Sequence, residues 1–136
     1  MTGKVKSSNP DLEFTSTTVK QFKDKFFYRA IFAEFFATSL FLYFVTTVQI
    51  NMSPETFGGP GIVQVAFTFG FTVTCLVQIF GPVSGAHMNP AVTVAFMFLG
   101  RTGMVKGFLY IVMQVAGGTE TILILRFNDL FGLITY

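Results

Sequence analysis

The sequence is poor in the residues that build most catalytic and metal sites. Its 136 residues include one cysteine, one histidine and no tryptophan, and only 12% are Asp, Glu, Lys or Arg. The single cysteine, Cys75, excludes an intramolecular disulfide and a cysteine-cluster metal site, and we expect it to be a small buried hydrophobe. With no second histidine, no carboxylates paired in register and no phosphate-binding glycine loop, the sequence predicts neither an enzyme nor a metal or cofactor site.

Apolar side chains, in contrast, are abundant. Hydrophobic residues make up 51% of the chain, phenylalanine alone occupies 19 positions, and the mean hydropathy is +0.62. These values lie far from those of soluble domains, so the sequence predicts an all-α integral membrane protein in contact with the lipid bilayer. The net charge of +2 is too small to indicate a nucleic-acid partner.

Long apolar runs predict three membrane-spanning helices. Residues 30–50 contain one charged side chain, Glu34, and residues 61–80 contain none. About 20 residues at roughly 1.5 Å each cross a hydrocarbon core of roughly 30 Å. Asn, Ser, Pro and Gly in residues 51–60 predict the connection between these two helices. A third helix is predicted from about residue 107. Polar residues interrupt its apolar run, namely Gln114, Thr119, Glu120 and Thr121.

The positions of the cations predict the orientation of the chain. Residues 1–26 are polar and lack the apolar centre of a cleavable signal, which predicts a cytoplasmic tail. Six of the nine Lys and Arg residues precede Ala30, none lies in residues 51–60, and Arg101 and Lys106 follow the second helix. Since cytoplasmic loops carry an excess of Lys and Arg, we expect a multi-pass protein with a cytoplasmic amino terminus, located in the plasma membrane.

The stretch SGAHMNPAV, residues 84–92, predicts a break followed by a new helix. Asn89 is suited to cap free N–H groups, and Pro90 fits the first turn of a helix. Residues 90–99 would span about 15 Å, half of the hydrocarbon core, which predicts a half-helix that dips into the membrane. An interfacial amphipathic helix after a surface loop is the alternative. The second helix is expected to be stopped by Gly81, Pro82, Ser84 and Gly85.

A half-helix of this kind places polar backbone at membrane depth. Non-helical backbone survives there only when it is packed in protein or lines water. The amino end of the helix has roughly half a positive charge and unpaired N–H donors. Gly85, Ala86 and His87 would expose a row of carbonyl acceptors before it. Rows of donors and acceptors suit a single file of water molecules.

These segments together resemble one protein family. SGAHMNPAV is similar to the first signature loop of the aquaporin family of major intrinsic proteins, AEFFATSLFLYF (residues 33–44) to its first helix, and VQVAFTFGFTV (residues 63–73) to its second. The resemblance covers residues 27–118. It implies a six-helix channel made of two inverted halves, each of which contributes one half-helix. This sequence holds one half, with three transmembrane helices and one half-helix.

The resemblance also implies roles for residues around the pore. Asn89 matches the pore-facing donor of the family, and Pro90 and Ala91 match the packed tip of the half-helix. Phe69 matches an aromatic residue of the narrow outer filter, although plain core packing is the alternative. The carbonyls that line the inner vestibule in the family match those of Gly85, Ala86 and His87.

Two polar residues match groups that support the loop. Glu34 corresponds to a glutamate that holds the backbone of the signature loop by hydrogen bonds. Gln114 corresponds to a glutamine of the third helix near the loop, and interhelical packing is its alternative role. For His87, a packed side chain remains the alternative to a pore-facing one.

The end of the chain departs from the family pattern. Residues 119–136 read TETILILRFNDLFGLITY, which puts Glu120 within the third helix, and no second Asn-Pro-Ala follows. The arginine and histidine of the family's filter have no counterparts. We therefore expect a truncated water channel for passive osmotic water transport. The alternative is a non-conducting subunit that associates with full-length aquaporins, as a homo- or hetero-oligomer, and regulates their assembly or trafficking. Asn51, in Asn-Met-Ser, is a candidate glycosylation site on the outer side.

Overall fold

All regular structure in the described part of the chain is helical. The computed structural model describes residue 22, residues 24–50 and residues 61–130. Its helices are α2 (Lys25–Ile50), α3 (Ile62–Ser84), α4 (Pro90–Phe98) and α5 (Met104–Leu130). Three of them, α2, α3 and α5, are long and apolar enough to cross a membrane. The predicted all-α fold is therefore confirmed, whereas Asn51 and most of the predicted tail lie outside the described residues.

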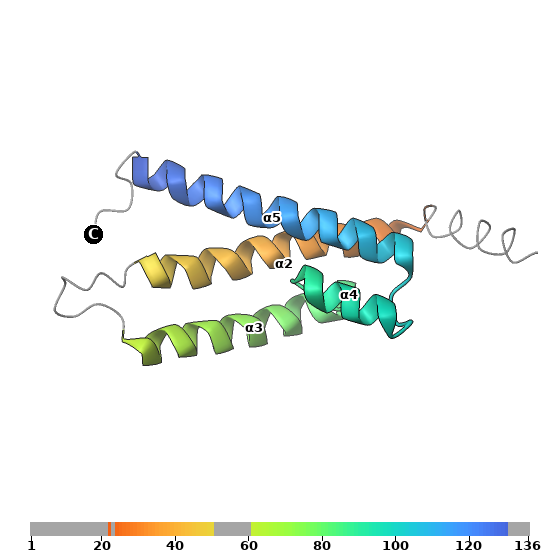
Figure 1. Cartoon of the computed structure of the whole chain (residues 1–136), viewed down its shortest axis with the longest axis horizontal. Helices are drawn as coiled ribbons and strands as arrows, with labels where there is room; N and C mark the ends of the chain where they lie inside the picture. The colour runs from red at the N-terminus through yellow and green to blue at the C-terminus, as the bar shows by residue number, and fades with distance from the viewer. Residues whose placement is uncertain (1–21, 23, 51–60, 131–136) are drawn as a thin grey trace, which may run out of the picture.

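Helix α2 is the central element of the bundle. It packs against α5 on one side and against α3 on the other, and the short α4 packs on α5 (Figure 1). Helices α2 and α5 run in the same direction and α3 runs opposite to them, as the colours of Figure 1 show. The chain leaves α3, begins α4 at about the middle of the bundle and returns toward the end from which α2 and α5 start.

Close packing of α2 on α5 depends on small side chains. A Cβ atom on Gly117 would lie 2.6 Å from the carbonyl oxygen of Phe35 and 3.0 Å from Ser39 Oγ. The Ser39 hydroxyl donates to Glu120 Oε2 at 2.7 Å, and the Thr121 hydroxyl donates to the Ser39 carbonyl at 3.0 Å. Glu120 and Thr121, which interrupt the apolar run of α5, thus bond to α2, whereas lipid would leave them unsatisfied.

Two clusters of buried apolar residues hold the helices together. One joins the starts of α2 and α5 through Phe27, Ala30, Ile31 and Tyr110. The other lies between α2, α3 and the segment after α3, and consists of Ala37, Leu76, Ala86 and Met88. The second cluster places the segment that contains Ala86 and Met88 against α2 and α3, inside the bundle.

Two expectations for the second helix were wrong. Gly81, Pro82 and Ser84 do not stop it, because α3 continues through Pro82 to Ser84 and ends at Gly85 alone. Pro82 has no N–H, so the last turn of α3 lacks one backbone hydrogen bond. This loss is tolerated more easily at a helix end than in the middle of a helix. Cys75 is exposed rather than buried, because α2 covers only one side of α3.

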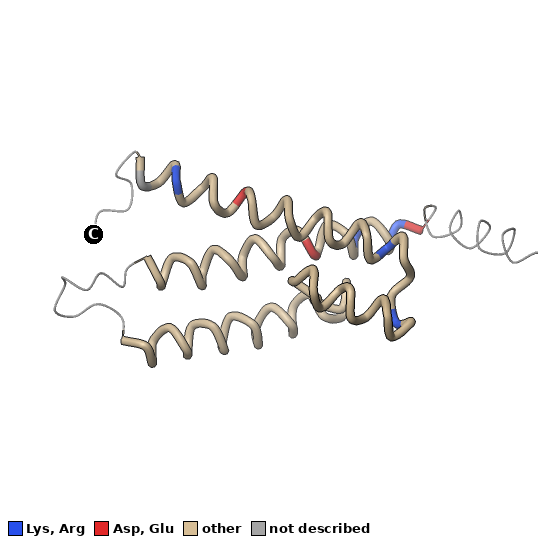
Figure 2. The backbone as a smooth tube through the Cα atoms, viewed as in Figure 1, with Lys and Arg blue, Asp and Glu red and all other residues tan. Residues whose placement is uncertain are grey.

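The charged residues of the described chain are unevenly distributed (Figure 2). Lys25 and Arg29 lie in the first turns of α2, Lys106 lies in the first turn of α5, and Arg101 lies in the connection before it. Only Arg126, among the described cations, lies toward the opposite end. One end of the bundle is therefore strongly cationic.

Candidate functional site

The segment between α3 and α4 has an unusual backbone. Gly85 ends α3 with a φ of 96°, and its N–H donates to the Gly81 carbonyl at 3.0 Å. Ala86 and Met88 also have positive φ values, 48° and 50°. This conformation costs a non-glycine residue roughly 1–2 kcal/mol. Other contacts must therefore compensate for the strain in this loop.

The buried carboxylate of Glu34 supplies those contacts. Glu34 is 0% exposed. Its Oε1 accepts hydrogen bonds from Ser84 Oγ at 2.6 Å and from the His87 N–H at 2.9 Å. Its Oε2 accepts from the Met88 N–H and from Gln114 Nε2, both at 2.8 Å. Successive backbone N–H groups directed at one anion form a concave binding site for it. Helix α2 thus fixes the loop through a single side chain.

Thr93 and Gln114 link this carboxylate to the start of α4. Gln114 Nε2 donates to Thr93 Oγ1 at 2.9 Å as well as to Glu34. Thr93 is 0% exposed, and its hydroxyl donates to the carbonyl of Asn89 at 3.1 Å. One hydrogen-bonded network therefore spans α2, α5 and α4. The structure brings together Glu34 and Gln114, the two residues that the sequence predicted to support the loop.

The side chain of His87 is a packed group. It is buried, its Nδ1 lies 3.1 Å from Thr93 Oγ1, and its ring stacks on Phe96 with centroids 4.7 Å apart. Tyr110 meets the same ring edge-on at 5.3 Å and donates its hydroxyl hydrogen to the Ser84 carbonyl at 2.8 Å. This geometry agrees with the packing alternative for His87, and only its backbone carbonyl lacks a partner among the described residues.

The tip of α4 presents polar groups outward. Asn89 caps the helix, with Oδ1 accepting from the Ala91 N–H at 2.8 Å, and Pro90 occupies the first turn, as the sequence predicted. The side chains of Asn89, Pro90 and Ala91 are exposed. Among the described residues, none accepts a hydrogen bond from the Asn89 amide nitrogen. None donates one to the carbonyls of Gly85, Ala86 or His87. These donors and acceptors thus have no partner in the described part of the chain, where Gly85 and Asn89 are exposed and Ala86 and His87 are buried.

Phe69 lies apart from this network. It is 47% exposed on α3, and its ring meets that of Phe41 on α2 edge-on at 5.2 Å. Fifteen residues separate it from Ser84, which corresponds to about 22 Å along the helix. Any role of Phe69 therefore belongs to another level of the bundle.

Three hydroxyl residues of the network could not be singled out from the sequence. Ser84 is expected there only as a helix stop, and Thr93 and Tyr110 carry no expectation. Their one signal is that each is a hydroxyl group within or beside an apolar run. Buried hydroxyls in such runs require partners, and all three find them here.

Comparison with known proteins gives a consistent result. A family model described as Major intrinsic protein matches residues 21–130. The chain is 43% identical over 91 residues to the lens fiber major intrinsic protein of Mus musculus and 42% identical over 91 residues to that of Homo sapiens. It is 41% identical over 96 residues to the probable aquaporin PIP2-6 of Oryza sativa subsp. japonica. These matches cover 67–68% of this chain but 34% of each relative. The chain therefore spans about a third of the length of the curated relatives it matches.

Proposed function

Since this chain belongs to the major intrinsic protein family and is an integral multi-pass membrane protein, we propose that it forms one half of the wall of an aquaporin-type water channel. Residues 27–118 form the half-channel in this proposal, and residues 119–136 are a divergent end. Water is the permeant, and transport is passive and driven by osmotic differences.

The unpaired carbonyls of Gly85, Ala86 and His87 are the observation that supports the proposal most strongly. An unsatisfied carbonyl in hydrocarbon costs several kcal/mol, so irregular backbone at membrane depth requires contact with protein or water. The N–H groups of Ala86, His87 and Met88 donate to Ser84 and Glu34, and no described residue donates to the three carbonyls. A row of water molecules beside the loop would satisfy them.

The start of α4 would supply selectivity. In the proposed pore, the Asn89 amide donates to a passing water molecule, while Pro90 and Ala91 pack the tip. The amino end of a helix has roughly half a positive charge, which opposes the entry of cations and protons. Phe69 is proposed to narrow the path at another level, and the cationic end of the bundle is proposed to face the cytoplasm of a plasma-membrane protein.

The described helices leave this path open on one side. Asn89, Pro90 and Ala91 are exposed, as is most of α3. A sealed single file therefore needs an opposing half-helix with its three helices in inverted orientation. A second segment or subunit with that orientation would complete the wall.

A second function is favoured by the surface of α3. Ala66, Gly70 and Thr74 are spaced by four residues and exposed, and no atom lies within 4 Å of a Cβ placed on Gly70. Small residues at this spacing permit close contact between membrane helices. The chain would then be a non-conducting subunit that binds full-length aquaporins and regulates their assembly or trafficking.

Osmotic water permeability in liposomes tests the proposal. The 136-residue chain is reconstituted alone and together with the carboxyl-terminal half of the rice relative, and shrinkage is followed by stopped-flow light scattering. We expect permeability above that of empty liposomes only with both halves, and a lower value with Asn89→Asp. An Asn89→Asp variant that conducts as well as the wild type would contradict the assigned pore. Reduced surface delivery of a co-expressed full-length relative, without conductance, would favour the second function.

A further inference from the structure

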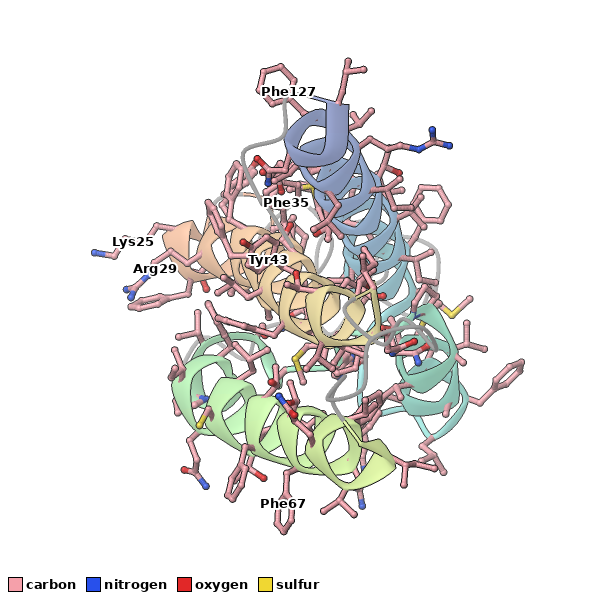
Figure 3. The ribbon with its side chains drawn as sticks, turned by 90° about the vertical axis from the view of Figure 1, so that its left-hand side faces the viewer. Lys25, Arg29, Phe35, Tyr43, Phe67 and Phe127 are labelled. Carbon is pink, nitrogen blue, oxygen red and sulfur yellow. The ribbon has the colours of Figure 1, made fainter. Side chains whose placement is uncertain are left out.

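Two cations converge on one exposed aromatic ring at the start of α2. Lys25 Nζ lies 5.5 Å from the centroid of the Phe26 ring, and Arg29 Cζ lies 5.7 Å from it. Both cationic side chains are exposed and project away from the other helices (Figure 3). Neither forms an ion pair with a described residue, and the nearby Asp24 carboxylate accepts the Phe26 N–H at 2.9 Å. This end of α2 therefore has positive charge that the described protein does not neutralise.

An apolar stripe continues from these cations along the same face of α2. Arg29, Phe32, Phe36 and Leu40 are spaced by three or four residues, which places them on one side of a helix. Phe32 is 55% exposed, Phe36 54% and Leu40 39%. Eleven residues separate Arg29 from Leu40, which is about 16 Å of helix, or half of a hydrocarbon core of roughly 30 Å. The stripe is therefore long enough to span one leaflet.

We propose that this face binds one anionic phospholipid. The headgroup phosphate lies between the Lys25 ammonium and the Arg29 guanidinium, and an acyl chain follows Phe32, Phe36 and Leu40 toward the bilayer centre. Charge complementarity selects the occupant, because the phosphate of a zwitterionic lipid is already balanced by the lipid's own cation and an apolar helix has no anionic group, so neither supplies net negative charge for Lys25 and Arg29. Lipid binding here requires no water pore, so the site stands independently of the proposed channel.

Native mass spectrometry of the full chain in detergent tests the site. The chain is titrated with phosphatidylglycerol or with phosphatidylcholine of the same acyl chains, and binding of the first lipid is measured. Each Lys or Arg near an anionic headgroup contributes about 1 kcal/mol, so the double variant Lys25→Gln/Arg29→Gln should bind phosphatidylglycerol roughly thirtyfold more weakly. Its affinity for phosphatidylcholine should be unchanged.

Matched variants distinguish binding at this site from a general effect of the protein's net charge. Arg101→Gln/Arg126→Gln removes the same charge elsewhere and should bind phosphatidylglycerol like the wild type, and Arg29→Lys should retain most of the preference. Equal weakening in both double variants, or none in Lys25→Gln/Arg29→Gln, would overturn the proposal. These side chains are exposed, so unchanged helicity by circular dichroism is expected for each variant.

Two further measurements test whether the bound molecule is a phospholipid. Phe36→Ala should weaken binding of phosphatidylglycerol about threefold through lost apolar contact, whereas Phe71→Ala, exposed on α3, should not. Inorganic phosphate at the same concentration should leave the lipid bound. Displacement by phosphate would show a simple anion site. A dimer that disappears with Lys25→Gln/Arg29→Gln would show a second copy as the occupant, and either result would overturn the proposal.

Discussion

At the scale of single residues, the loop before α4 depends on Glu34 more than on any of its own side chains. Four donors from Ser84, His87, Met88 and Gln114 surround its two oxygens. Hydrogen bonds to a charged acceptor are roughly twice as strong as neutral ones. They offset the strain of positive φ at Ala86 and Met88. The carboxylate therefore acts as a structural anion rather than as a reactive group.

Replacing Glu34 by Gln should destabilise the protein. A Gln side chain has one oxygen and an NH₂ group, so at least one buried N–H of the loop loses its acceptor, at a cost of about 2 kcal/mol. Unfolding by sodium dodecyl sulfate, followed by circular dichroism, measures the loss.

Glu120→Gln is the matched control for that variant. Glu120 lies on α5, is half-buried, and accepts its one described hydrogen bond from Ser39. A Gln oxygen can accept the same bond, so the cost should stay below about 1 kcal/mol. Equal destabilisation by the two variants would contradict the special role of Glu34.

The sequence predicted some members of this network and not others, for a physical reason. Burying a carboxylate in an apolar helix has a high free-energy cost, so Glu34 stood out in the sequence as a functional candidate. Hydroxyl side chains have a small free-energy cost in a helix, so nothing in the sequence singled out Ser84, Thr93 or Tyr110. Their partners also lie far away in sequence, since Ser84 bonds to Glu34 across 50 positions. Only the tertiary fold reveals such pairs.

At the scale of elements, the cap of α4 was predicted better than the helix boundaries. Asn89 and Pro90 start α4 as expected, because capping is a local property. Helix α3 passes through Pro82 and α5 begins at Met104 rather than near residue 107. Packing decides these ends. Tyr110 packs against Phe27 near the start of α5, and Ser84 needs a helical position to reach Glu34.

The contact between α2 and α5 should be sensitive to one methyl group. Gly117→Ala would place a Cβ 2.6 Å from the Phe35 carbonyl oxygen, which forces the helices apart and disturbs the Ser39 bonds. We expect a loss of about 1–3 kcal/mol in unfolding by sodium dodecyl sulfate.

Gly70→Ala on α3 provides the comparison. No atom lies within 4 Å of a Cβ placed at this position, and alanine is the better helix former by roughly 1 kcal/mol. This variant should therefore be neutral or stabilising. Equal losses for Gly117→Ala and Gly70→Ala would contradict close packing at Gly117.

At the scale of the whole molecule, the bundle has two kinds of exposed surface. The outer face of α2 is apolar below its cations and suits lipid. The tip of α4 is exposed near the middle of the bundle, beside loop carbonyls that have no described donor, which suits water. Sequence patterns predicted the existence of both surfaces. The family resemblance already implied that Glu34 holds the loop, but the sequence could not show which donors surround its two oxygens.

The most direct test of a water-lined loop is whether water reaches the α4 tip in a bilayer. In a Cys75→Ser background, Ala91→Cys and Phe36→Cys are each reconstituted in liposomes together with a cysteine-free carboxyl-terminal half of the rice relative, and treated with a charged, membrane-impermeant thiol reagent. Both positions are exposed, and Phe36 lies two residues after Glu34, at nearly the depth of the loop. We expect rapid labelling of Ala91→Cys and little labelling of Phe36→Cys. Equal protection of the two positions would contradict a water-lined loop.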